Sequence, residues 1–381
     1  MIKLFFKKYD MAIVGSLCTN DILFAEHLSR QGLRPLVLRQ KRHQNISSVM
    51  TNKNDYFHAY NLSEIKYINN PFEFLWWAYQ CRMIVSFTGS LIGFLNFLFF
   101  VKKIIGLPPC VHISTGSDLS ELVAEKSIKG YLYRNYLNFM DMVYGSYYPH
   151  ILSNTIDFKI KKYYFDRVPL FYILEKSKKM KKDHEVIFFH FSHLDWKLVD
   201  NKKGRNSSKG NDRFIKAFIR AVKSGMKARC VILFRGPDRE AARKMIEESG
   251  CSRQFTWKPH LEREDLFQQM RDCDVVVDQF DVGGLGGGAI EAMSLGKPVM
   301  AYVCKECSRF FYRNDFPPVL NCQTEEEIYQ QIIKCNDWDL LEKIGDCSSE
   351  WAIRNYRDDN SLVDFIFHYQ RITGHQIIKY V

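Results

Sequence analysis

The sequence of 381 residues lacks the features that mark several common protein classes. It contains no internal repeat and no long low-complexity segment, which argues against repeat proteins and disordered chains. Its longest apolar stretch, Ile84 to Val101, is interrupted by polar residues such as Thr88 and Asn96, whereas a spanning helix needs about 20 mostly apolar residues. We therefore predict no transmembrane helix there, but a strand over Ile84 to Phe87 and then a helix that is buried or touches a membrane surface.

The chain also lacks a recognisable secretory signal and any nucleic-acid-binding motif. Its 11 cysteines are spread along the sequence, and we interpret them as reduced cytosolic thiols, without a metal site or a redox dithiol. The net charge of +11 favours an anionic partner. Because no nucleic-acid motif accompanies that charge, we predict no nucleic-acid partner. The candidates are a nucleoside diphosphate ligand and an anionic membrane surface, so we expect a cytoplasmic protein, peripheral on the inner membrane face in the second case.

Hydrophobic residues make up 46% of the chain, and its length suits two domains rather than one. Short apolar strands alternate with amphipathic helices in both halves, which is typical of α/β proteins. The first such unit runs from a strand at Met11 to Val14, through a helix that begins near Asp21, to a strand at Pro35 to Leu38. Gly15 in its first turn either lines a cleft or only shapes the turn, since one glycine is no dinucleotide-binding fingerprint.

A basic and aromatic stretch from Ile156 to Lys182 separates the two halves and is interpreted as the inter-domain linker. We accordingly predict an N-terminal Rossmann-like domain over residues 1–165 and a C-terminal Rossmann-like domain over residues 166–350. A helical segment over residues 351–381 would complete the chain.

The densest motif lies between Asp274 and Val303. Val275 to Val277 is a β-branched run, typical of a strand buried on both faces. Five glycines then fall within six positions, namely Gly283, Gly284, Gly286, Gly287 and Gly288. A short helix-favouring stretch follows and ends at Gly296, before a second strand at Val299 to Val303. The unit is therefore a strand, a glycine loop, a helix and a strand.

Such a loop has a physical use, because glycines let the backbone approach a ligand closely and the free amides at a helix N-terminus favour phosphate. With the helix beginning near Gly287, Glu291 lies one turn in, on the same face as those amides. A diphosphate on the amides would then bring sugar hydroxyls within reach of Glu291. The alternative is a glycine-rich turn followed by an acid placed in the first helical turn for its dipole.

This segment, including the run Ile-Glu-Ala-Met-Ser-Leu-Gly-Lys-Pro-Val that starts at Ile290, resembles the donor-nucleotide signature of the family 4-like (group 1) glycosyltransferases. The resemblance implies the GT-B architecture, in which two Rossmann-like domains face each other across a cleft and a last helix crosses back to the first domain. The family signature has two glutamates with seven residues between them. Glu291 matches the second glutamate, whereas Gly283 stands at the position of the first.

The resemblance also implies roles for basic residues. Lys209, which precedes Gly-Asn-Asp, matches the lysine of a basic pair that neutralises the donor diphosphate in this family. Arg205 is the candidate for the arginine of that pair, and His193 is an alternative occupant of its place. A solvated basic loop would account for Lys209 and Arg205 without any ligand.

Two further sets of residues follow from the same resemblance. Gly116, Ser117 and Asp118 match a Gly-Ser-Asp that the family places at the cleft, although Asp118 also has the spacing of a helix-capping residue. In place of the missing first glutamate, we favour Asp281 over Asp278 as the acid that contacts the donor sugar, because the glycines give its loop freedom. The alternative is that Asp281 only shapes the turn.

The resemblance therefore implies a retaining hexosyltransferase that needs no metal and no cofactor, because in such enzymes helix amides and basic side chains stabilise the leaving diphosphate. Its donor would be a nucleoside diphosphate sugar, bound by Gly284, Gly286, Gly287, Gly288 and Glu291. Its acceptor would be a glycan or lipid-linked molecule in cell-surface polysaccharide or glycolipid synthesis. Two alternatives stay open, a sugar-nucleotide epimerase of the same fold and a non-catalytic subunit that binds sugar nucleotides. A dehydrogenase is disfavoured, because no acidic ribose partner follows the glycines at the expected distance.

Overall fold

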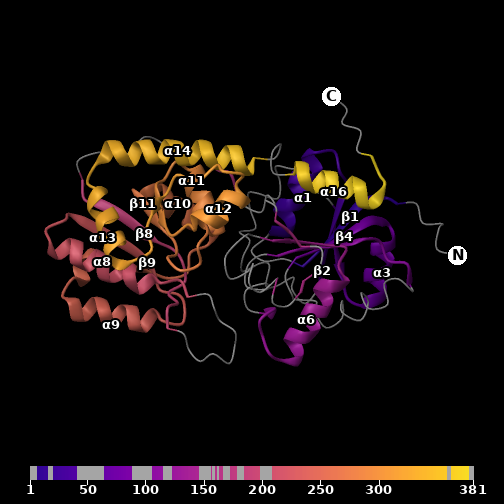
Figure 1. The fold of residues 1–381 in the computed structure, drawn as a ribbon, viewed down its shortest axis with the longest axis horizontal. Helices are drawn as coiled ribbons and strands as arrows, with labels where there is room; N and C mark the ends of the chain where they lie inside the picture. The colour runs from indigo at the N-terminus through magenta and orange to yellow at the C-terminus, as the bar shows by residue number, and fades with distance from the viewer. Residues whose placement is uncertain are drawn as a thin grey trace. The chain divides into compact units, whose positions relative to one another are not determined.

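The chain forms two compact units, which Figure 1 shows as ribbons. Unit 1 comprises Met1–Leu170, Lys202–Gly204 and Asp358–Val381, and unit 2 comprises Phe171–Asn201 and Arg205–Arg357. The computed structural model describes residues 7–15, 20–40, 64–87, 105–114, 122–145, 156, 159–160, 163–165, 172–177, 184–197, 208–357 and 362–376.

Unit 1 contains a parallel sheet, which in its described part has seven strands in the order β3-β2-β1-β4-β5-β6-β7. The strands are β1 (Tyr9–Val14), β2 (Pro35–Gln40), β3 (Ile65–Ile68), β4 (Cys81–Phe87), β5 (Cys110–Ile113), β6 (Met142–Gly145) and β7 (Tyr163–Phe165). The central strands are buried except at Arg82 of β4, as expected where helices cover both faces of a parallel sheet. The order 3-2-1-4-5-6 of the first six strands is that of a Rossmann fold.

Helices α1 (Asn20–Arg30) and α16 (Val363–Thr373) cover one face of this sheet, because the ring of Phe24 contacts both Phe87 of β4 and Phe365 of α16. Helices α3 (Pro71–Tyr79) and α6 (Ile128–Phe139) pack with Ile84, which alternation along β4 places on the opposite face. The hydroxyl of Tyr369 in α16 donates a hydrogen bond to the buried Asp10 at 2.9 Å. The last helix is therefore an integral part of unit 1.

Unit 2 contains a second parallel sheet, with six strands in its described part in the order β10-β9-β8-β11-β12-β13. The strands are β8 (Val186–His190), β9 (Ala228–Leu233), β10 (Phe255–Lys258), β11 (Val275–Val277), β12 (Val299–Ala301) and β13 (Leu320–Asn321). Counted from β8, this is again the order 3-2-1-4-5-6. The prediction of two Rossmann-like domains is confirmed.

The helices of unit 2 form two layers on this sheet. They are α8 (Asn211–Lys223), α9 (Arg239–Ser249), α10 (Arg263–Asp272), α11 (Gly287–Ser294), α12 (Lys305–Phe311), α13 (Glu325–Lys334) and α14 (Trp338–Tyr356). Helices α8, α9 and α13 share a core with Phe188, whereas α10, α11 and the second half of α14 share a core with Phe189. Since adjacent residues of a strand point to opposite faces, the two cores lie on opposite sides of the sheet.

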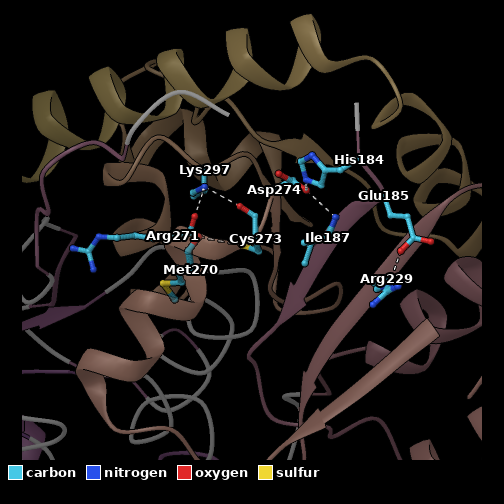
Figure 2. Close-up of polar contacts among 9 residues, drawn as sticks. All are labelled: His184, Glu185, Ile187, Arg229, Met270, Arg271, Cys273, Asp274 and Lys297. Carbon is cyan, nitrogen blue, oxygen red and sulfur yellow. Dashed lines mark hydrogen bonds and ion pairs between the residues drawn. The ribbon is translucent and has the colours of Figure 1, made fainter. Parts of the chain in front are cut away.

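The amino ends of the unit 2 strands are held by the polar contacts shown in Figure 2. Asp274, just before β11, accepts hydrogen bonds from the amide of Ile187 at 2.8 Å and from His184 at 3.0 Å. The buried Lys297 donates to the carbonyls of Arg271 and Cys273, each at 2.8 Å, at the end of α10. Lys297 belongs to the Gly-Lys-Pro of the glycine unit, and these contacts assign it a structural role at the end of the strands away from the glycine loop.

Two predictions need correction or restriction. The stretch Ile156 to Lys182 is not only a linker, because its aromatic residues at 163–165 form β7, the edge strand that pairs with β6. Ile84 to Phe87 is a strand as predicted, and the remainder of that apolar stretch, up to Val101, lies outside the described residues. No helix that the structure describes is both long and apolar enough to cross a membrane.

Candidate functional site

The candidate site lies where the chain order of the unit 2 sheet reverses, between β8 and β11. In open α/β sheets, ligands bind beyond the carboxyl ends of the strands at such a point. His193 lies in the loop that follows β8, and the glycine loop follows β11. Lys209 lies just before α8, and its backbone hydrogen bonds with Asp195 and Phe280 hold it beside these two loops. The fold therefore brings these predicted site residues to one edge of the sheet.

The glycine loop ends at the N-terminus of α11, which begins at Gly287 as predicted. The first amides of a helix have no partner within that helix, so those of Gly287 and Gly288 are suited to an anion. The amide of Gly286, which caps the helix, donates to Asp278 at 2.9 Å. A Cβ atom at Gly288 would lie 2.5 Å from the ring of Phe191, so only glycine lets the helix start pack this closely.

Gly283 shows how the chain departs from the family signature. Its φ of +80° lies in the left-handed region, which a glutamate would adopt only with strain. Its carbonyl accepts a hydrogen bond from the amide of Cys304 at 3.0 Å, which fixes this backbone. The loop thus has a backbone conformation suited to glycine at this position, and the change involves more than the loss of one carboxylate.

Lys209 is fixed by contacts to both loops of the site. Its amide donates to the carbonyl of Asp195 at 2.6 Å, and its own carbonyl accepts from the amide of Phe280 at 2.7 Å. Its ammonium group donates to the side chain of Gln279, whose amide nitrogen in turn holds the carbonyl of Gly284 at 2.9 Å. Lys209 is therefore attached to the glycine loop through Gln279, and its role towards a diphosphate stays a prediction.

The surroundings of His193 indicate a positive electrostatic field at this edge. Desolvation of the ring lowers the pKa of His193 to about 4, and the neighbouring Arg235, Lys209 and His260 add to that shift. His193 is therefore neutral near pH 7. Because Arg235 follows β9 and His260 follows β10, cationic or basic groups come from three successive loops of the sheet edge. Such a field favours an anionic ligand.

Glu291 is buried in the first turns of α11, with 5% of its surface exposed. Its Oε1 atom accepts a hydrogen bond from Arg263 at 2.7 Å and a longer one from the amide of Tyr172 at 3.4 Å. Burial raises the pKa of Glu291, and the charge of Arg263 acts in the opposite direction. The carboxylate predicted to hold a ribose is thus already oriented by a cation.

The two acids considered for the sugar contact have different environments. Asp278 is buried at the end of β11, where burial raises its pKa while Lys209 and the amide of Gly286 lower it. Asp281 is one-third exposed and forms an ion pair with Arg213 of α8. Asp278 thus holds the loop together, whereas Asp281 has an exposed edge through which it could meet a ligand.

A buried polar network beneath the site was not predicted. The side-chain amide of Asn211, the first residue of α8, donates to His190 at 3.0 Å and to Ser192 at 3.1 Å. Ser192 in turn donates to the carbonyl of Asp278 at 2.8 Å. Burial lowers the pKa of His190 to about 4, so it is the neutral ring that accepts from Asn211. The network joins the loops after β8 and β11. The polar residues His190 and Ser192 at the end of the apolar strand β8 were the sequence signal that could have predicted it.

The interpretation of the cysteines as spread along the sequence missed one close pair. Cys304 and Cys307 are separated by two residues and therefore form a Cys-x-x-Cys motif at the start of α12. Both are buried free thiols, and burial raises the pKa of Cys307 to about 12, which keeps it protonated. Within the described ranges, no group of three or more His, Cys, Asp and Glu side chains could hold a metal ion.

The other predicted site residues lie in unit 1 or in segments without a description. Gly15 follows β1 with φ of +84°, which is the conformation of a turn glycine. Arg205 and the residues Gly116, Ser117 and Asp118 lie outside the described residues. Their roles stay predictions.

Comparison with known proteins gives the class of protein to which this fold and site correspond. Residues 202–315 match the family model for glycosyl transferases group 1, and the matched segment includes Lys209, the glycine loop and Glu291. No significant match was found among curated protein sequences. The family model therefore confirms, over this part of the chain, the resemblance to group 1 glycosyltransferases that the glycine unit indicated.

Solved structures confirm the GT-B fold. HepE from Anabaena, determined in complex with UDP and glucose, matches with a TM-score of 0.65 and 14% identity over 94% of this chain and 99% of its own. A glycosyltransferase from Rickettsia africae matches with a TM-score of 0.63 and 13% identity over 97% of this chain and 100% of its own. TarM matches with a TM-score of 0.56 and 16% identity over 75% of this chain, and the match spans only 54% of the length of TarM.

Proposed function

We propose that this protein is a retaining, metal-independent glycosyltransferase that transfers a hexose from a nucleoside diphosphate sugar to a glycan or lipid-linked acceptor. The observation that carries the proposal is the glycine-rich N-terminus of α11, which lies beside Lys209 at the carboxyl edge of the unit 2 sheet. The match of this segment to group 1 glycosyl transferases supports it. The UDP and glucose bound to HepE support a nucleoside diphosphate hexose as the donor.

In this proposal each residue stabilises one part of the donor. The amides of Gly287 and Gly288 and the ammonium of Lys209 bind the diphosphate and stabilise the negative charge that develops on it as the sugar leaves. Arg205 supplies the second cation, and Glu291 accepts hydrogen bonds from ribose hydroxyls. Gly116, Ser117 and Asp118 belong to the acceptor side. Because amides and cations provide the stabilisation, a chelator should leave the activity unchanged.

The test is transfer from radiolabelled UDP-glucose, GDP-mannose or ADP-glucose to a membrane glycolipid extract, with the anomeric configuration of the product read by NMR. An epimerase would convert the donor in the absence of any acceptor. A non-catalytic subunit, which the replacement of the first glutamate by Gly283 would suit, would bind the donor without turnover on any acceptor. Product formed with inversion, or only with added magnesium or manganese, would contradict the proposed chemistry.

Asp281→Asn is expected to reduce sugar transfer about 10- to 100-fold, as for loss of a charge-assisted hydrogen bond to the sugar. Binding of the sugar-free nucleoside diphosphate should change little, because the acid would contact only the sugar. The measurement compares kcat for transfer with the Kd of the nucleoside diphosphate.

The matched control is Arg213→Met, which removes the partner of Asp281 and leaves the carboxylate in place. If Asp281 only shapes the turn through this ion pair, both variants should lose transfer equally. If Asp281→Asn keeps full activity, the sugar contact lies with Asp278 or with backbone amides.

We also propose that the α3–α6 face of unit 1 docks on an anionic membrane. Helix α3 exposes Phe72 (81%) and Trp76 (55%) one turn apart, and α6 exposes Ile128 (80%) next to the exposed Lys129. Both helices cover the same face of the sheet. Exposed apolar side chains on two helices, with a lysine beside one of them, suit the interface of an anionic bilayer, and the net charge of +11 agrees with such a partner.

The Phe72→Ser/Trp76→Ser double variant should lower binding to vesicles of phosphatidylcholine and phosphatidylserine about tenfold or more, since fully burying one such side chain contributes about 1.5–3 kcal/mol. Phe367→Ser is the control, because Phe367 is 58% exposed on α16, which covers the other face of the sheet. Vesicle sedimentation at low and high salt measures both. Equal binding to neutral and anionic vesicles, or none, would contradict the docking proposal.

A further inference from the structure

Arg263 is placed so that it controls how Glu291 meets a ligand. It is the first residue of α10, directly after the loop that follows β10, and its Nη1 atom lies 2.7 Å from Oε1 of Glu291. Its guanidinium carbon lies 4.7 Å from the ring centre of Tyr172 and 5.6 Å from that of Phe267. The two rings are themselves in edge contact, with centres 5.9 Å apart, so the guanidinium rests on a fixed aromatic support.

The contacts of Glu291 are one-sided. Both of its hydrogen bonds, from Arg263 and from the amide of Tyr172, are accepted by Oε1. Among the described residues, its Oε2 atom has no polar partner. A buried carboxylate held through one oxygen therefore keeps the lone pairs of the other for a ligand.

We propose that Arg263 is a positioning residue for donor recognition: it holds Glu291 ionised through Oε1 and leaves Oε2 to accept hydrogen bonds from the ribose hydroxyls. This inference rests on the proposed function, because it requires that Glu291 binds the ribose. Arg263 itself does not contact the donor in this arrangement. It acts on ribose recognition through Glu291.

The charge state of Glu291 gives the inference a specific readout. Burial raises the pKa of Glu291, and Arg263 is the charged group of the described residues that opposes this rise. Without Arg263, the pKa of Glu291 should increase further, so that the carboxylate becomes protonated as the pH falls. A protonated carboxyl loses the charge-assisted hydrogen bonds that distinguish ribose from a sugar without hydroxyls.

The experiment uses the full chain and whichever of UDP-glucose, GDP-mannose or ADP-glucose binds to the wild type. The affinity for this donor and for its 2′,3′-dideoxy analogue is measured by calorimetry at several values between about pH 6 and pH 8.5. The donor diphosphate keeps its charge in this range. The preference for ribose is the ratio of these two affinities. For Arg263→Met we expect this ratio to fall about tenfold at the acid end of the range and less at the alkaline end. In the wild type the ratio should change little with pH.

Four further variants make the result specific. Glu291→Gln should lose the ribose preference at every pH, and Arg263→Met/Glu291→Gln should show no pH dependence beyond that of Glu291→Gln. Arg263→Lys, which keeps a charge near Glu291, should fold and show an intermediate preference. Arg271→Met removes a positive charge from the exposed side of the same helix and should behave as the wild type.

The outcomes separate this inference from the proposed function. If none of the three nucleotide sugars binds to the wild type, the proposed function fails and the inference fails with it. If the wild type binds a donor and Arg263→Met weakens the ribose and dideoxy ligands equally at every pH, only the inference is overturned. In that case Arg263 would support the local packing without a role in recognition.

Discussion

Lys209→Ala is expected to weaken binding of a nucleoside diphosphate about 10- to 150-fold, because a hydrogen bond to a charged group contributes about 1.5–3 kcal/mol. Binding of the corresponding nucleoside, which has no phosphates, should change little. The reason is that the ammonium group is held at the glycine loop through Gln279, where it would face phosphate oxygens. Calorimetric titration with the nucleoside diphosphate and the nucleoside gives both values.

The control for this prediction is Lys216→Ala, which removes a positive charge from the exposed side of α8 and from an ion pair with Asp212. It should leave both affinities as they are, apart from a small salt-dependent effect. If Lys209→Ala weakens the nucleoside and the nucleoside diphosphate by equal factors, Lys209 acts on folding through its backbone neighbours and its assignment to the diphosphate is wrong.

Glu291→Gln is expected to lower the affinity for the donor about 5- to 30-fold, with the fold retained. Glutamine preserves the size of the side chain in its buried position, but it loses the charge that strengthens hydrogen bonds from hydroxyl groups. The loss should be large for a ribose nucleotide and small for its dideoxy analogue. Donor affinity, turnover and the unfolding midpoint are to be measured on the same preparation.

Asp265→Asn provides the comparison for Glu291→Gln, because Asp265 is an exposed acid on α10, near the start of that helix. It should change neither donor affinity nor turnover. Wild-type affinity and turnover in Glu291→Gln would remove Glu291 from the site, and a collapse of the unfolding midpoint would instead show that its pairing with Arg263 supports the fold.

The strands and helices that carry the site could be predicted because their patterns are local. The run Val275 to Val277 is buried on both faces and forms β11, and the glycines that follow it lead into α11 at Gly287. The same local signals located β8 and α8. These elements together determine a Rossmann order and its ligand-binding edge, so the position of Lys209 beside the glycine loop followed from the fold.

The partners of the site residues could not be predicted, because they come from distant parts of the sequence. The pairing of Glu291 with Arg263 depends on how α10 packs beside α11, and the pairing of Asp281 with Arg213 depends on the start of α8. A glutamate near the start of a helix looks the same in sequence whether its oxygens are free or occupied. The edge strand β7 was missed for a similar reason, since its three aromatic residues resemble a basic linker until β6 pairs with them.

The replacement at Gly283 illustrates a third case, in which the sequence shows the change but not its cause. A missing glutamate suggests only a lost contact, whereas the positive φ shows that the backbone itself differs from one suited to a side chain. Restoring the family residue by Gly283→Glu is therefore a poor test of the sugar contact, because backbone strain would obscure any gain.

The central claim is that a nucleoside diphosphate sugar binds between Lys209, the start of α11 and Glu291. Thermal unfolding with UDP-glucose, GDP-mannose and ADP-glucose tests this claim most directly. A ligand at 100 times its Kd adds about 2.7 kcal/mol to the free energy of unfolding, which corresponds to a rise of about 5–10 °C in the midpoint for a unit of this size. We predict such a rise with at least one of the three in the wild type and a much smaller rise in Lys209→Ala. No rise with any of them, or an equal rise in both proteins, would contradict the account.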